Sequence, residues 1–338
     1  MPPKPAHLHL VPQPAPRAQA LWYVAPGRAE LRPVVLPPPG RDEVVVRTLH
    51  SALSRGTERL VFAGRLPPGE WPRMRAPAQE GEFPFPVKYG YAAVGVVEQG
   101  PAALRGRAVF ALHPHQERFV LPAAAVVPLP PGVPPRRGVL AANLETALNA
   151  IWDSAVAPAD RVLVIGAGVV GCLVAALAAR LPGAAVTLVD VAPERAAVAE
   201  RLGAAFALPA AAPPGADVVF HCSASAEGLA LALGAAGTEA TIVEMSWYGD
   251  QPVSLPLGGD FHSRRLKLVS SQVGEVAPSH RTRWSRRRRL EAALGLLADP
   301  RFDALPLEEV AFGEAAAALP RLLAPGAPGL GAVLCYAD

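Results

Sequence analysis

Glycines at positions 166, 168 and 171 form a Gly-x-Gly-x-x-Gly pattern directly after a short apolar run, Arg161–Ile165. The run is rich in β-branched residues, which is typical of a strand buried on both faces of a parallel sheet. In such a unit the first glycine makes the strand-to-helix turn, the second lets the backbone approach a pyrophosphate, and the third lets helix and strand pack closely. The pattern therefore predicts phosphate binding at the start of the next helix.

An acid follows at the end of the next expected strand, Ala184–Val189, where Asp190 stands. A carboxylate here can bond ribose hydroxyls and repels a 2′-phosphate, so we expect NAD as the cofactor. Arg195 lies just beyond and leaves NADP possible. His221 and Ser246 follow later strands, at the edge where cofactors bind. The residues expected to contact the nucleotide are Gly166, Gly168, Val169, Val170, Gly171, Asp190, Arg195, His221 and Ser246.

The same region has a second interpretation, because the run Val162–Ala179 contains no charged residue and could be a membrane helix. The three glycines and the abrupt second strand favour a strand–helix–strand unit instead. We therefore expect no membrane partner.

Length and composition are those of a globular protein with room for two domains: 338 residues with a net charge of +3. The cysteines at 172, 222 and 335 form no Cys-x-x-Cys pair, so neither a disulfide framework nor a cysteine zinc site is indicated. The N-terminus carries no arginine-rich or hydrophobic targeting segment, and we expect a cytoplasmic protein.

The elements that must position these residues fall into two kinds. Residues from about 20 to 127 predict short strands separated by Pro and Gly, which indicates a compact β-rich domain. A helix over Gly138–Ala155 leads into the glycine motif. Strands and helices then alternate, as in a doubly wound parallel sheet, and Gly331–Tyr336 is a last strand.

This order resembles the medium-chain dehydrogenase/reductase superfamily over nearly the whole chain. The resemblance implies an α/β fold: a Rossmann domain with a doubly wound parallel sheet, plus a β-rich, GroES-like catalytic domain. We place the catalytic domain at residues 1–145, the NAD(P)-binding domain at 146–305, and a C-terminal return to the catalytic domain at 306–338.

At the positions where zinc-containing members carry their metal ligands, this chain has other residues. Ser54 replaces the first cysteine, Tyr91-Ala92 replaces a His-Glu pair, and Thr146 or its neighbour Glu145 stands at the third position. Zinc takes thiolate, imidazole or carboxylate ligands, and these replacements supply at most one. We expect a zinc-free member and no metal.

Five segments look like one subgroup, that of bacteriochlorophyllide a hydroxyethyl dehydrogenase and its relatives described as zinc-binding alcohol dehydrogenases. The segments are SRGTE from Ser54, RMRAP from Arg73, QEG from Gln79, FPVKYGY from Phe85 and HPHQ from His113. The resemblance implies hydride transfer between NAD(P) and an alcohol or ketone. The substrate could be anionic, such as a tetrapyrrole side chain, since arginine suits carboxylate recognition.

Without a metal, hydrogen-bonding groups must move the proton that accompanies the hydride. Tyr91 is the first choice, because it replaces a zinc ligand, although it could merely fill the space of the metal. His113 could shuttle protons or be an ordinary surface histidine. The expected catalytic residues are Tyr91, Thr57, Ser54, Glu58 and His113, and the expected substrate-binding residues are Arg55, Tyr89, Lys88 and Glu145.

Two other functions remain open. A zinc-free member could be an NADPH-dependent enone or quinone reductase, against which Asp190 argues. The chain could also bind a cofactor without catalysis and use its basic run, Arg281–Arg289, for a partner or nucleic acid. We expect a small-molecule substrate and no nucleic acid, and a homodimer is possible, with Ala240–Met245 as a candidate interface.

Overall fold

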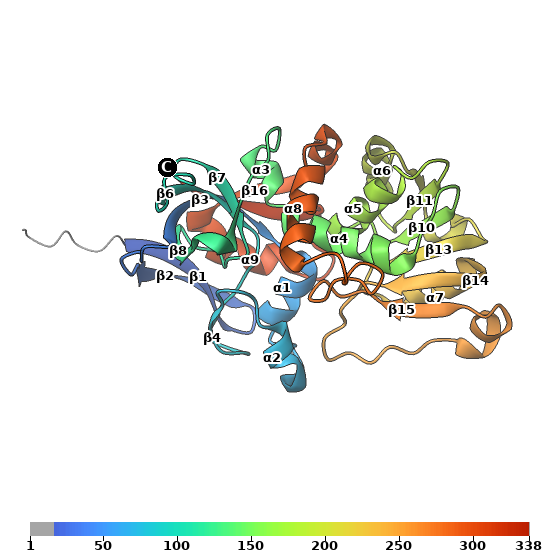
Figure 1. Cartoon of the computed structure of the whole chain (residues 1–338). Helices are drawn as coiled ribbons and strands as arrows, with labels where there is room; N and C mark the ends of the chain where they lie inside the picture. Colours follow the sequence, from blue (N-terminus) through green and yellow to red (C-terminus); the bar gives the residue numbers. More distant parts are fainter. Residues whose placement is uncertain (1–16, 338) are drawn as a thin grey trace, which may run out of the picture.

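The computed structural model describes residues 17–337, which form an elongated molecule with a β-rich half and an α/β half (Figure 1). In the β-rich half, a small sheet has the strand order β2-β1-β5-β4. Its strands are β1 (Arg17–Ala25), β2 (Arg28–Val35), β4 (Glu80–Gly81) and β5 (Val87–Lys88). Strand β1 pairs antiparallel with β2.

A larger sheet combines strands of the first half of the chain with the last two strands, in the order β16-β17-β3-β6-β7-β9, and β8 also pairs with β3. Its strands are β3 (Glu43–Leu53), β6 (Ala93–Gln99), β7 (Ala108–Ala111), β8 (Arg118–Pro122), β9 (Val126–Pro128), β16 (Leu307–Ala311) and β17 (Gly331–Cys335). The C-terminal strand β17 pairs with β3, so the chain returns to its first half.

The α/β half is built on a parallel sheet with the order β12-β11-β10-β13-β14-β15. Its strands are β10 (Arg161–Ile165), β11 (Ala185–Val189), β12 (Ala205–Ala207), β13 (Ala216–His221), β14 (Ala236–Glu244) and β15 (Lys267–Ser270). The order reverses at β10, where the next strands lie on either side, and such a switch point is where ligands bind in open α/β sheets. This sheet confirms the expected fold class.

Helices cover the sheet and connect the halves. They are α1 (Arg55–Phe62), α2 (Trp71–Met74), α3 (Pro135–Gly138), α4 (Ala141–Ser154), α5 (Val169–Ala178), α6 (Ala196–Leu202), α7 (Ala226–Ala235), α8 (Arg286–Leu296) and α9 (Ala315–Leu322). One face of β10 and β13 packs with α4 and α5 through residues such as Val164 and Phe220. The other face packs with α7 through residues such as Leu163 and Val219.

One sequence expectation needs correction: helix α1 lies where only strands and turns were expected. Helix α8 begins inside the basic run, at Arg286. Strand β14, which contains most of the candidate interface, is hydrogen-bonded on both sides, and β15 is the outer strand.

Residues 162–179 form a strand and a ten-residue helix rather than one membrane helix. Within residues 17–337, no helix combines the length and the apolar character that crossing a membrane requires.

Candidate functional site

The glycine motif forms the turn between β10 and α5, and each glycine has its own environment. Gly166 has φ of +102°, and a Cβ there would lie 2.7 Å from the Ser223 nitrogen. A Cβ on Gly171 would lie 1.9 Å from the Gly166 carbonyl oxygen, whereas one on Gly168 would meet nothing within 4 Å. Two glycines therefore pack the turn, and the middle one leaves open space beside the start of α5. This geometry fits a nucleotide phosphate.

Asp190 is held beside this turn by two backbone amides. Ala167 N donates to Oδ2 at 2.6 Å, and Ala192 N donates to Oδ1 at 2.9 Å. Arg195, which could attract a 2′-phosphate, donates instead to the carbonyl oxygen of Gly329 at 2.9 Å. The carboxylate is thus fixed next to the phosphate turn, while the guanidinium is tied to a loop of the other half.

His221 and Ser246 belong to one polar cluster at the carboxyl ends of β13 and β14. His221 is fully buried; its Nδ1 lies 2.8 Å from Glu244 Oε2 and its Nε2 lies 2.7 Å from Ser223 Oγ. The Ser246 amide donates to Glu244 at 2.7 Å, and Ser246 Oγ accepts from Ala224 N at 3.0 Å. The cluster holds together the two loops that follow these strands.

In the β-rich half, the Tyr91 hydroxyl donates to Ser54 Oγ. The two residues that stand where zinc-containing members carry metal ligands therefore contact each other. Ser54 is the N-cap of α1, and Thr57, in the first turn of this helix, also bonds with Tyr91. Burial and the nearby charge of Glu58 raise the pKa of Tyr91 to about 12. Tyr91 is therefore a protonated hydrogen-bond donor at neutral pH.

Behind this hydroxyl cluster (Ser54, Thr57, Tyr91) lies the fully buried carboxyl group of Glu58. It accepts from Tyr23 OH at 2.5 Å and from the Ser54 amide at 2.7 Å, and His115 Nε2 lies 3.0 Å away. Burial by itself would raise the pKa of Glu58, but His115, Tyr23 and the Ser54 amide together lower it. Glu58 is thus a stable anion under the hydroxyls.

The two residues at the third of these positions, Glu145 and Thr146, also make hydrogen bonds within the protein. Glu145 accepts from Arg289 Nε at 2.9 Å, with both side chains buried, and Thr146 Oγ1 donates to the Ala142 carbonyl at 3.0 Å. Within residues 17–337, no group of three or more His, Cys, Asp or Glu side chains could hold a metal ion. The donors at the three positions do not fit a tetrahedral zinc site.

Comparison with known proteins covers both halves of the chain. Residues 146–238 match the family of the alanine dehydrogenase/PNT C-terminal domain. L-idonate 5-dehydrogenase of Escherichia coli K-12 has the same fold with a TM-score of 0.76 at 14% identity, over 95% of this chain and 98% of the other. A protein described as a zinc-binding dehydrogenase from Sinorhizobium meliloti, bound to NADP, has a TM-score of 0.75 at 20% identity, over 95% and 99%. The chain therefore shares the fold of these dehydrogenases.

A curated relative adds a sequence match: D-guloside 3-dehydrogenase of E. coli K-12 is 26% identical over 286 residues, 76% of this chain and 81% of the relative. These matches support an oxidoreductase that uses a nicotinamide cofactor. They leave the substrate and the role of zinc open.

In this dehydrogenase fold, His113 and His115 differ from each other. His113 is buried, stacks on Phe119 with ring centroids 3.9 Å apart, and bonds to the Pro114 carbonyl. Burial lowers the pKa of His113 to about 3, so it stays neutral. His115, for which the sequence analysis gave no role, is the histidine that bonds to Glu58.

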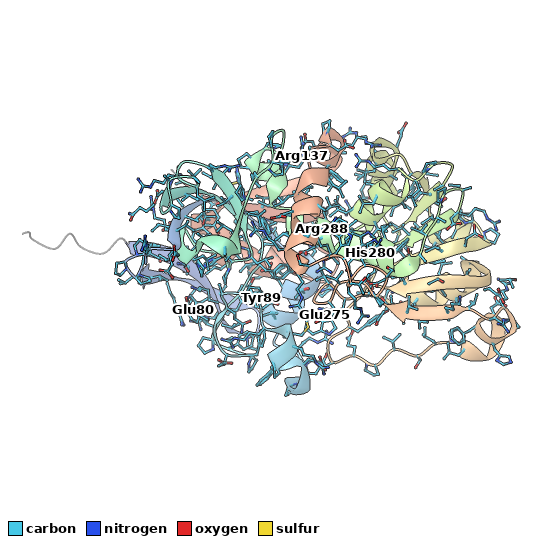
Figure 2. The ribbon with its side chains drawn as sticks, in the orientation of Figure 1. Glu80, Tyr89, Arg137, Glu275, His280 and Arg288 are labelled. Atoms are coloured by element: carbon cyan, nitrogen blue, oxygen red, sulfur yellow. The ribbon has the colours of Figure 1, made fainter. Side chains whose placement is uncertain are left out.

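The basic and aromatic residues expected at the substrate have partners within the protein. Lys88 is 1% exposed and donates to Glu80 at 2.5 Å and to Gln116 at 2.6 Å, and Tyr89 OH donates to the Met74 carbonyl at 3.3 Å (labels Glu80 and Tyr89 in Figure 2). Arg55 donates to three carbonyls of the 327–329 loop. Each of these side chains therefore has a hydrogen-bond partner within the protein.

The basic run also makes mostly internal contacts. Arg288 lies 4.0 Å above the ring of Trp284, Arg286 pairs with Glu275 at 2.5 Å, and Arg287 reaches the Ala124 carbonyl of the β-rich half at 2.8 Å. Figure 2 shows Glu275, His280 and Arg288 near the middle of the molecule. This segment therefore fastens α8 to its surroundings.

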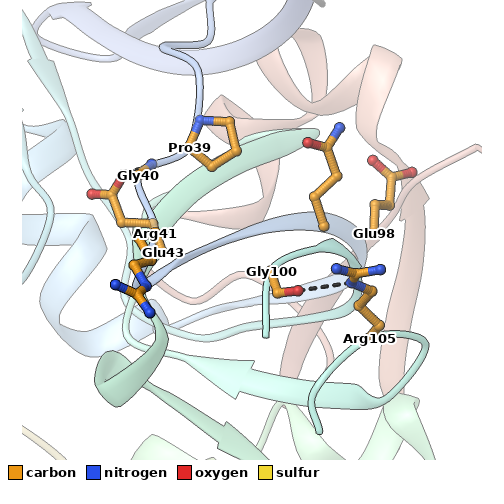
Figure 3. A pocket seen from close by; sticks show the side chains of 8 residues that line it. Pro39, Gly40, Arg41, Glu43, Glu98, Gly100 and Arg105 are labelled. Atoms are coloured by element: carbon orange, nitrogen blue, oxygen red, sulfur yellow. Dashed lines mark hydrogen bonds between the residues drawn. The ribbon is translucent and has the colours of Figure 1, made fainter. Parts of the chain in front are cut away.

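A separate hollow of about 420 Å³ lies in the β-rich half, at the turns before β3 and after β6 (Figure 3). Two hydrogen bonds join residues that line it: Gly40 N donates to Glu43 at 2.7 Å, and Arg105 donates to the Gly100 carbonyl at 2.7 Å. It contains none of the expected site residues, and we assign it no role.

Proposed function

We propose that this protein is an NAD-dependent dehydrogenase that exchanges a hydride with a secondary alcohol or the matching ketone, and that hydroxyl groups handle the proton in place of zinc. The phosphate turn beside Asp190 is the observation that carries the proposal, because its open middle glycine and fixed carboxylate suit a dinucleotide. The matches to dehydrogenases support the same reaction class.

The preference for NAD over NADP follows from charge. The Asp190 carboxylate would repel a 2′-phosphate, and Arg195 is already bonded to the Gly329 carbonyl. Binding of NADP would require Arg195 to leave that contact. We therefore expect tighter binding of NADH than of NADPH.

The bound nicotinamide supplies the hydride acceptor or donor. The chain would hold the substrate oxygen with Tyr91 and Ser54, which form one hydrogen-bonded pair. In ketone reduction, the Ser54 hydroxyl can give its proton to the oxygen that receives negative charge and take the Tyr91 proton in return, since Tyr91 already donates to Ser54. Burial and the nearby anion Glu58 keep this phenol protonated, and its hydrogen bond to Ser54 orients it.

We propose a neutral polyhydroxy compound as the substrate, since the hydroxyl cluster matches alcohol groups and the nearby basic side chains have partners. The curated relative acts on a D-guloside and the structural neighbour is named for L-idonate. An anionic substrate such as a tetrapyrrole side chain would need Arg55 or Lys88 to give up its present contacts.

The first experiment is a fluorescence titration of metal-free protein with NADH and NADPH, followed by NAD⁺ reduction with methyl D-guloside and L-idonate. Tyr91→Phe should lower kcat by about 100-fold, the usual range for losing an acid–base group, with NADH affinity unchanged. Loss of the measured rate on chelation, with recovery on adding zinc, would contradict the zinc-free mechanism.

The other readings are outcomes of the same titration. Preference for NADPH would favour an enone or quinone reductase. Binding of neither nucleotide would overturn the proposal and favour a non-catalytic role. The domain boundaries at 145/146 and 305/306, a cytoplasmic location and a homodimer remain part of this proposal.

A further inference from the structure

The segment Ser246–Asp250 leaves the carboxyl end of β14 and crosses to the β-rich half. Trp247 packs against the core cluster of that half, which includes Leu60 and Phe62 of α1. Tyr248 stays with the α/β half, because its hydroxyl donates to Glu244 Oε2 at 3.2 Å. Two consecutive side chains of one segment are thus anchored in different halves of the molecule.

The next two residues contact the C-terminal end of α1. Gly249 has φ of +66°, and a Cβ there would lie 2.7 Å from the Arg65 carbonyl oxygen and 3.0 Å from Leu60 Cδ2. Asp250 accepts from Arg65 at 2.7 Å. The segment can approach α1 this closely only because residue 249 has no side chain.

Helix α1 connects this contact to the hydroxyl cluster. Ser54 occupies its N-cap position, Thr57 and Glu58 lie in its first turns, and Leu60 near its other end lies beside Gly249. On the cofactor side, the segment starts at Ser246, which the His221–Glu244 pair holds through a 2.7 Å bond to its amide. One short path therefore joins the edge that would bind the nicotinamide to the helix that carries the hydroxyls.

We propose that residues 246–250 are a positioning element, which sets the distance between the bound nicotinamide and the Ser54–Tyr91 pair. This inference rests on the proposed function. Residues 246–250 act through α1 and through the loop after β14. Hydride transfer is sensitive to such placement, because a shift of about 1 Å can cost about 100-fold in rate.

Gly249→Ala is the test, because the added Cβ must push the segment away from α1. Gly106→Ala is the matched control: its φ is +72°, so it has the same backbone cost, but its Cβ would meet nothing within 4 Å. We expect Gly249→Ala to bind NADH within about twofold of the unaltered protein and to lower kcat by about 10- to 100-fold on methyl D-guloside or L-idonate. Gly106→Ala should change neither value by more than about twofold.

A second readout needs no substrate. Acrylamide quenching of Trp247, obtained by difference from Trp247→Phe, should rise at least twofold in Gly249→Ala and not in Gly106→Ala. Unchanged quenching, or full kcat with the segment displaced, would overturn the inference. A protein that binds no NADH or oxidises neither probe would contradict the proposed function instead, while the quenching comparison still decides whether the segment holds the halves together.

Discussion

Glu58 is the residue that most shapes the polar side of the candidate site. Its carboxyl group is fully buried, yet three donors surround it: Tyr23, His115 and the Ser54 amide. A buried charge is tolerated only with such partners. Burial, with a smaller contribution from this anion, raises the pKa of Tyr91, so Glu58 influences how the hydroxyl cluster can act.

The lowered pKa of Glu58 makes the stability of the folded protein depend on pH. Because the folded protein binds this proton less tightly than the unfolded chain, the stabilisation is present above the ordinary value of 4.5 and is lost as the pH falls through the lowered value. Glu58→Gln should therefore reduce stability at pH 7 and flatten its decline in acid. Urea unfolding at pH 7 and at about pH 3.5 measures how much stability each protein loses in acid. An equal loss in both proteins would contradict the prediction.

At the scale of elements, the glycines of the turn between β10 and α5 have different roles: one allows close packing and another leaves space for a ligand. Gly171 touches the backbone of Gly166, while Gly168 faces open space. The two positions carry the same residue type for different reasons.

The pair Gly168→Ala and Gly171→Ala separates these reasons. Gly168→Ala should fold normally and weaken NADH binding by about tenfold, roughly 1.4 kcal/mol, because its methyl group enters the phosphate space. Gly171→Ala should lower the midpoint of thermal unfolding, because its Cβ overlaps the Gly166 carbonyl. Calorimetry and NADH titration of both variants measure these effects; unfolding of Gly168→Ala would show that the middle glycine is structural.

At the scale of the whole molecule, buried polar contacts fasten the segment after β15 to α4. Arg289 bonds to Glu145, to Asn149 at 2.5 Å and to the Glu275 carbonyl at 3.0 Å. Ser271 donates to Asp153 at 2.7 Å, two turns farther along α4. Together these contacts connect the end of the cofactor sheet with the helix that enters it.

Removing one member of the buried Arg289–Glu145 pair should lower the stability of the protein. Arg289→Met leaves Glu145 buried without its cation and should destabilise the protein by about 3–5 kcal/mol, whereas adding Glu145→Gln should recover part of that loss. Urea unfolding of the single and double variants gives the coupling. Equal stability of Arg289→Met and the unaltered protein would show that water or another group replaces the arginine.

The sequence by itself determined the phosphate turn, the order of β-rich and α/β halves, and the return of the last strand, because these depend on local glycine spacing and apolar periodicity. The sequence analysis missed α1, because this helix is only eight residues long and lies among strands. Only the tertiary structure decided that His115 rather than His113 meets Glu58, that Glu145 is paired with Arg289, and that Ser246–Asp250 joins the halves. Those pairings bring together residues far apart in the chain, and spacing along a sequence carries no information about which distant side chains meet.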